Sequence, residues 1–160
     1  MTGIALTPYT PADRPWLVEA HGRLYAEAEG FDQSFPRLVD DILQGFKAAH
    51  DPTCEHGWIA RDAGQPLGSI FCVRQEDETA KLRLFLLLPE ARGKGLGQRL
   101  LDRCMGFARE AGYRRMTLWT HESHRAACAL YARNGFSCLR STPVQNFGVA
   151  LVEQQWERPL

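Results

Sequence analysis

A glycine-rich segment between an expected strand and an expected helix constrains this chain more than any other feature. The apolar run 82–88 is typical of a strand, and it stops at Pro89, which cannot donate a hydrogen bond to a sheet. Glycines then occupy positions 93, 95 and 97, and apolar residues with helical spacing begin at Leu96. Amides at a helix N-terminus point toward one place, which suits an anionic group such as a pyrophosphate. The segment therefore predicts a phosphate-binding turn.

Two familiar phosphate loops do not match this segment. No Gly-Lys-Ser/Thr closes it, so it is not a Walker A loop, and the Gly-x-Gly-x-Gly spacing lacks the wider last gap of the dinucleotide-binding fingerprint. A plain turn between a strand and a helix is the alternative interpretation of the glycines alone. The preceding strand and Pro89, together with Arg92 and the following helix, favour phosphate binding.

A second motif, Ala127-Cys128-Ala129-Leu130-Tyr131-Ala132-Arg133-Asn134-Gly135-Phe136, follows downstream. It predicts a helix that ends in a left-handed turn at Asn134-Gly135, followed by a strand from Phe136. Together the two motifs resemble the GNAT superfamily of N-acetyltransferases. In that family Arg-x-x-Gly-x-Gly after a strand and a proline is the acetyl-CoA pyrophosphate loop, and the tyrosine of Ala-x-x-Leu-Tyr-x-x-x-Gly-Phe lies close to the CoA sulfur.

The resemblance extends over the whole chain and implies one domain, 1–160, with the α/β (α+β) GNAT acyl-CoA N-acyltransferase fold, a mixed, mostly antiparallel central sheet flanked by helices. Residue patterns agree with this layout. Strands are expected at 3–8, 56–61, 67–75, 82–88, 116–120, 136–139 and 147–157, and helices at 10–30, 35–46, 96–112 and 123–133.

Segments such as 80–84, 118–120 and 146–148 further resemble the acetyltransferase domain that is often fused to MarR-type winged-helix regulators. Because strand signals begin at Gly3, we expect a stand-alone domain without the regulator's DNA-binding role.

The resemblance also implies a set of residues that bind acetyl-CoA, the co-substrate. The backbone of one strand would hold the pantetheine arm and polarise the thioester, and the glycine loop would hold the pyrophosphate. These residues are Leu86, Leu87, Leu88, Arg92, Gly93, Lys94, Gly95, Leu96, Gly97 and Gln98. Direct phosphate contact by Lys94 or Arg99 is left open. His124 replaces an asparagine of the family, so one hydrogen bond to CoA is expected to be altered or absent.

Tyr131 is the expected general acid, because a phenol with a pKa of about 10 can protonate a thiolate whose conjugate thiol has a pKa of about 8.5. A core aromatic residue is the alternative. The base is open, because the strand 82–88 has no carboxylate. Glu122 and His121 are candidates beside a water relay, and each also fits an ordinary surface or helix-end residue.

The acceptor side is expected to include His21, Tyr25, Glu27 and Phe31, by the same resemblance. The expected acceptor is an amine, which stays open between a small amine, an amino acid, an antibiotic and a protein lysine. A non-catalytic acyl-CoA-binding sensor is the alternative function. A homodimer formed through exposed edge strands is a further hypothesis.

Composition narrows the partners and the compartment. The 19 basic and 19 acidic residues give no net charge, which disfavours nucleic acid. No signal peptide or apolar membrane span is evident, so we expect a cytoplasmic protein without a membrane partner. Five cysteines without a Cys-x-x-Cys pair predict free, buried thiols. The series His121-x-x-His124-x-x-x-Cys128 lacks a fourth ligand, so no metal is expected.

Overall fold

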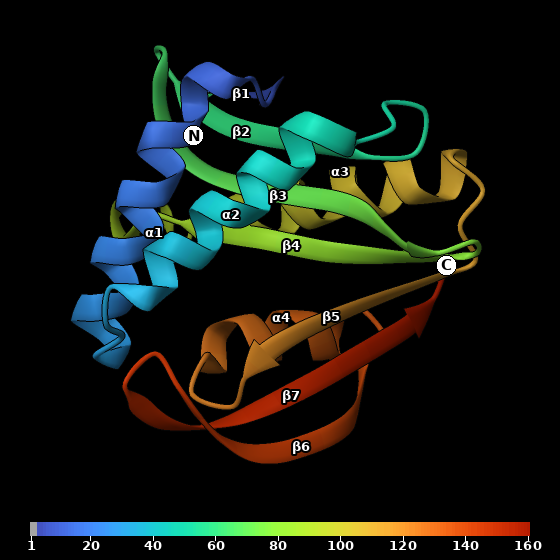
Figure 1. Cartoon of the computed structure of the whole chain (residues 1–160). Helices are drawn as coiled ribbons and strands as arrows, with labels where there is room; N and C mark the ends of the chain where they lie inside the picture. Colours follow the sequence, from blue (N-terminus) through green and yellow to red (C-terminus); the bar gives the residue numbers. More distant parts are fainter. Residues whose placement is uncertain (1–2) are drawn as a thin grey trace.

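A seven-stranded sheet with the strand order β1-β2-β3-β4-β5-β7-β6 organises the computed structural model, which describes residues 3–160 (Figure 1). The strands are β1 Ile4–Pro8, β2 His56–Asp62, β3 Gln65–Glu76, β4 Thr79–Leu87, β5 Arg115–His121, β6 Ser137–Asn146 and β7 Val149–Pro159. The helices are α1 Arg14–Glu29, α2 Ser34–Ala49, α3 Leu96–Glu110 and α4 Arg125–Arg133, with short 3-10 turns η1 Pro11–Asp13 and η2 Pro89–Ala91. All neighbouring strands are antiparallel except β4 and β5, which confirms the expected mixed sheet.

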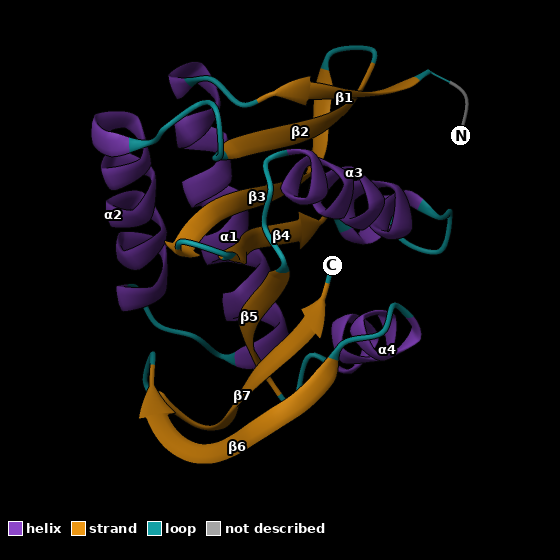
Figure 2. Cartoon of the chain, turned by 90° about the vertical axis from the view of Figure 1, so that its right-hand side faces the viewer, coloured by secondary structure: helices purple, strands orange, loops and turns teal. Residues whose placement is uncertain are grey.

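Helices cover both faces of the sheet. Helices α1 and α2 lie on one face of its β2–β4 half, and α3 and α4 lie on the opposite face (Figure 2). Leu100, Leu101 and Cys104 of α3 are fully buried against one face, whereas Leu17 of α1 and Leu43 of α2 are fully buried against the other. None of the helices within residues 3–160 is both long enough and apolar enough to cross a bilayer.

A β-bulge lies in the middle of β4. The register with β3 passes from Phe71↔Arg83 to Ser69↔Leu86, and Leu84 takes a left-handed φ of 50°. The bulge places the consecutive side chains of Arg83 and Leu84 on the side of α2. Beyond the bulge, the alternation of side chains between the two faces of the sheet is therefore shifted by one residue.

Strands β4 and β5 separate soon after they begin. Their parallel pairing covers only Thr79↔Arg115, Ala80↔Met116 and Lys81↔Thr117, and beyond it the two strands diverge (Figure 1). The later part of β4 therefore has a free edge on this side, while its other edge stays paired with β3.

Three expectations need correction. Strand β6 extends to Asn146 rather than 139, because it is an exposed edge strand whose pairing with β7 was not visible as an alternation of apolar residues. Helix α4 begins at Arg125, two positions later than expected, after a turn closed by the His124 amide and the His121 carbonyl. Cys138 is exposed, so the prediction of buried thiols is wrong for this residue, whereas Cys72 and Cys104 are fully buried.

Candidate functional site

The glycine loop forms an open cradle at the N-terminus of α3. Gly93 and Gly95 have φ angles of 76° and 79°, which side chains rarely adopt, and a Cβ added at either would meet no atom within 4 Å. The first amides of α3, those of Leu96, Gly97 and Gln98, have no carbonyl of a preceding helical turn to bind. The loop thus presents unpaired donors to open space, as an anion such as a pyrophosphate requires.

Helix α3 is held tightly against β4 and α4. A Cβ added at Gly97 would lie 3.2 Å from Leu87 Cδ1, so the absence of a side chain allows the helix to approach the strand. The amide side chains of Gln98 and Asn134 hydrogen-bond each other in both directions, at 2.7 and 2.9 Å. This pair ties the loop to the end of α4. Sequence reasoning missed it, because asparagine before glycine was interpreted only as a helix end.

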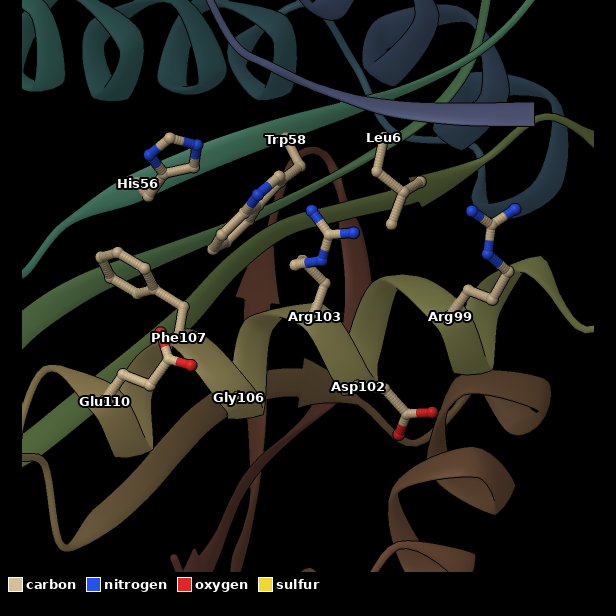
Figure 3. Close-up of a pocket in the computed structure, with 9 residues that line it drawn as sticks. All are labelled: Leu6, His56, Trp58, Arg99, Asp102, Arg103, Gly106, Phe107 and Glu110. Carbon is tan, nitrogen blue, oxygen red and sulfur yellow. The ribbon is translucent and has the colours of Figure 1, made fainter. Parts of the chain in front are cut away.

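The basic side chains near the loop have separate partners. Arg92 Nη2 donates to the Leu87 carbonyl at 3.1 Å, and Lys94 Nζ donates to the Glu90 carbonyl at 3.2 Å. Arg99 contacts the Ile4 carbonyl at 3.4 Å and points into a groove of about 560 Å³ between α3 and strands β1 and β2 (Figure 3).

The predicted pantetheine strand has its free edge beside the loop. Leu86 and Leu88 pack toward α1, whereas Leu87 packs toward α3. The Leu88 amide donates to Leu67, on the β3 side. On the other side the pairing with β5 has ended at Lys81, so the backbone of this segment can bind an extended ligand.

Tyr131 lies on α4 next to this free edge. The residue is 4% exposed, and its ring centroid lies 5.6 Å from that of Phe136 and 6.3 Å from that of Phe85. Its hydroxyl hydrogen-bonds no residue in the described part of the chain. Burial, followed by the nearby Tyr25, raises the pKa of Tyr131, so the phenol keeps its proton at neutral pH.

The imidazole of His124 and the carboxylate of Glu29 lie close together where β4 and β5 diverge. His124 Nε2 lies 3.5 Å from Glu29 Oε1, and His124 Nδ1 lies 3.5 Å from Thr120 Oγ1. The side chain of Glu29 is only 13% exposed. The Tyr25 ring lies 4.8 Å from the His124 ring. Burial lowers the pKa of His124, and Glu29 partly opposes that shift.

His121 and Glu122, the two candidate bases, occupy different environments. His121 is half-buried, its Nδ1 has no hydrogen-bond partner within residues 3–160, and it lies opposite Glu153 in the register of β5 and β7. Burial lowers its pKa. Glu122 is exposed, so of the two candidate bases only His121 lies with His124 inside the site. Glu27 is likewise exposed on α1, and the carboxylate inside the site is that of Glu29, two positions further around the helix.

Aromatic rings gather where the acceptor side is expected. Tyr25, Phe31 and Phe35 surround one another with centroid distances of 4.6–5.5 Å. Phe147, in the turn between β6 and β7, lies 4.8 Å from Phe31, and its carbonyl accepts the Asp32 amide at 2.9 Å. The structure thus brings together Tyr25 and Phe31, two of the residues expected on the acceptor side. Phe35 was not expected beside these rings, because its spacing fits a core position of α2.

His21 is buried between α1 and α2, at 2% exposure. Its Nδ1 lies 2.7 Å from the Leu17 carbonyl, so the neutral ring carries its proton on Nδ1. Its Nε2 has no hydrogen-bond partner among the described residues. Burial lowers the pKa of His21 to about 4, so it stays uncharged at neutral pH.

The low pKa of His21 predicts that the folded protein loses stability in acid. Because its pKa of about 4 in the folded state lies below the unfolded value of 6.5, the unfolded state binds more protons between these values. The contribution of His21 to the free energy of unfolding is therefore complete above pH 6.5, and about 3 kcal/mol of it is lost as the pH is lowered to 4. We expect His21→Leu to flatten this slope in urea unfolding measured from pH 7 to 4.5.

The matched control is His50→Leu. His50 makes the same kind of contact, from Nδ1 to the Phe46 carbonyl at 2.8 Å, but on an exposed face. Its removal should leave the slope unchanged, and equal slopes in wild type and His21→Leu would contradict the assignment.

No group of three or more His, Cys, Asp or Glu side chains in the described part of the chain is arranged to hold a metal ion. Cys128 Sγ lies 3.7 Å from the His121 carbonyl and 3.6 Å from Gln154 Oε1.

Solved structures share this fold over the whole chain. An acetyltransferase from Streptococcus agalactiae matches with a TM-score of 0.82 and 24% identity, and 100% of both chains is covered. The putative acetyltransferase yncA from Salmonella typhimurium, solved with acetyl-CoA, matches with a TM-score of 0.80 and 19% identity, over 99% of this chain and 95% of that one.

Curated relatives match over part of their length. An uncharacterized N-acetyltransferase of Methanocaldococcus jannaschii is 28% identical over 120 residues, which cover 71% of this chain and 53% of the relative. A mycothiol acetyltransferase of Beutenbergia cavernae is 30% identical over 125 residues, which cover 74% of this chain and 41% of the relative. The chain thus spans about half the length of these relatives. Residues 14–136 match the model of the acetyltransferase (GNAT) family, and the chain therefore belongs to the GNAT family.

Proposed function

We propose that this protein is an N-acetyltransferase that moves the acetyl group of acetyl-CoA to a primary amine by direct attack, with both substrates bound. The observation that carries the proposal is the free edge of β4 between the glycine loop and Tyr131. The loop fits a pyrophosphate, since Gly93 and Gly95 leave open space in front of the helix amides. A related fold, the Salmonella typhimurium protein, was solved with acetyl-CoA.

Bound acetyl-CoA supplies a thioester, whose carbonyl carbon bonds to the amine nitrogen while the carbon–sulfur bond breaks. The backbone amide near Leu87 is placed to stabilise negative charge on the carbonyl oxygen. Tyr131 donates its proton to the departing sulfur. The proton that the nitrogen loses goes to a base, so the nitrogen loses one proton and the sulfur gains one.

His124 and His121 are the groups best placed to take that proton. Both lie at the divergence of β4 and β5, and burial lowers both pKa values, which keeps the rings neutral and able to accept a proton. Glu122 is less suited, since it is exposed. Tyr25 and Phe31 are proposed as wall residues of the acceptor site, with Glu29 in place of Glu27, and the buried His21 as a residue behind that wall.

Acetyl-CoA turnover in the presence of amines tests the proposal. Thiol release would be followed with a panel of polyamines, amino acids and lysine peptides, and acetyl-CoA affinity would be measured by calorimetry. We expect release that depends on the amine. Tight acetyl-CoA binding without release across the panel would instead favour an acyl-CoA-binding sensor. No binding would show that the loop does not hold the nucleotide.

A further inference from the structure

Two basic side chains face the acceptor side of the central strand. Ala80 and Leu82 of β4 pack into the core under α3, so Lys81 and Arg83, which alternate with them, point to the opposite face. Their partners across the sheet agree, because Arg83 pairs with Phe71, which packs against α1 and α2. Both cations are half-buried.

Neither cation forms an ion pair with a carboxylate among the described residues. No carboxylate of residues 3–160 lies within 4.0 Å of the Lys81 or Arg83 nitrogens, and neither side chain donates a hydrogen bond in this part of the chain. Burial lowers the pKa of both groups, and the charge of Arg83 lowers that of Lys81 further. Removing a charge from water without an opposite charge beside it costs free energy, so two adjacent, partly desolvated and unpaired cations are costly to keep.

A cavity lies beside Arg83. It measures about 280 Å³ and lies between α2 and strands β3 and β4. The cavity is also lined by Asp41 of α2, by Arg74, which forms an ion pair with Asp77, and by Glu55. The carboxylate oxygens of Glu55 accept the amides of Asp51 and Arg74 at 2.8 and 2.9 Å. Its volume is close to the lower end of the range for small-molecule sites.

The opposite charge lies farther along the diverging strands. Glu153 faces His121 across β7 and β5, and its charge acts on both His121 and Lys81. Glu29 also acts on His121. The acceptor side therefore has a cationic end at Lys81 and Arg83 and an anionic end at Glu153 and Glu29.

We propose that the acceptor amine carries an acidic group, a carboxylate or a phosphonate, which Lys81 and Arg83 bind. This inference rests on the acetyltransferase function proposed above. The amino end of the substrate then lies toward Glu153 and His121, beside the thioester position at Leu87. Arg83 precedes Leu87 by four residues, which corresponds to roughly 13 Å along a regular strand. The bulge shortens this distance. An extended arginine side chain and a small substrate together bridge it.

Matched pairs of amines test the proposal. L-Methionine and L-phenylalanine would each be compared with their α-amides, and 2-aminoethylphosphonate with ethanolamine. We expect wild type to favour the acid-bearing member of at least one pair by about 10- to 100-fold in kcat/KM. Arg83→Met and Lys81→Met should each remove most of that preference by lowering kcat/KM for the acid-bearing member. The pair that responds distinguishes carboxylate from phosphonate.

Arg114→Met is the control, since Arg114 is a largely exposed cation just before β5, beside Glu78. This substitution should leave kcat/KM unchanged for both members of each pair. A second measurement excludes a purely structural role: without ligand, Arg83→Met should melt at a higher temperature than wild type, because an unpaired half-buried charge is removed. A lower melting temperature together with equal losses for both members of each pair would overturn the proposal.

The two proposals fail in different ways. Equal use of acids and amides by wild type would overturn the role of Lys81 and Arg83 while leaving the acetyltransferase intact. If no amine is acetylated, the role of Lys81 and Arg83 is tested by thermal shifts, measured with the same amines and with CoA. Stabilisation by the acids alone, lost in Arg83→Met, would support an anion site in a protein that is not an acetyltransferase. No selective stabilisation would overturn both proposals.

Discussion

Gly95→Val is expected to weaken acetyl-CoA binding by about 100-fold, measured by titration calorimetry. Gly95 caps α3 with a φ of 79°, where a β-branched residue is strongly disfavoured. The loop can relieve that strain, on the order of 1–3 kcal/mol, only by turning its backbone, which moves the amides of Leu96 and Gly97 out of alignment. A valine side chain would also occupy the open space in front of the helix.

The control for this variant is Gly64→Val. Gly64 has a φ of 82° in the turn between β2 and β3, and a Cβ there would also meet nothing within 4 Å. It carries the same backbone strain away from the loop, so it should lower the melting temperature without changing acetyl-CoA affinity. If both variants bind acetyl-CoA as wild type does, the glycine loop is not the pyrophosphate site.

The elements that the sequence predicts well are those whose pattern is local. The central strand expected at 82–88, which in the structure begins at Thr79, the loop glycines and the end of α4 at Asn134 each follow from residues within a few positions of one another. Strand β6 was predicted too short because both of its faces are largely exposed and only its pairing with β7 defines it. Pro143 is tolerated there because β6 is an edge strand.

The acceptor side depends on contacts between distant segments, so its residues were only partly predictable. Glu29 and Glu27 look alike in the sequence, and only the position of α1 relative to the turn before α4 shows which one meets His124. Lys81 and Arg83 alternate with apolar residues, a signal that a basic strand face is present. That no carboxylate of residues 3–160 forms an ion pair with either of them is a property of the folded chain.

Tyr131→Phe is expected to lower kcat by about 10²- to 10⁴-fold while acetyl-CoA affinity stays within a factor of two or three. The phenol lies beside the free edge of β4 and keeps its proton because burial raises its pKa. Without it the CoA thiolate must leave unassisted. Stability should be unchanged, since the hydroxyl forms no hydrogen bond with residues 3–160. Stopped-flow thiol release and calorimetry separate the two effects.

Tyr113→Phe provides the opposite control. Tyr113 is also buried, but its hydroxyl donates to the Cys54 carbonyl at 2.8 Å, away from the site. Removing that hydrogen bond should cost about 1 kcal/mol of folding free energy and leave kcat unchanged. The two variants delete the same atom from buried tyrosines, so a kinetic effect in Tyr131→Phe alone identifies the proton donor. Similar kcat values for wild type and Tyr131→Phe would reduce this tyrosine to a packing residue and leave substrate positioning as the main source of rate.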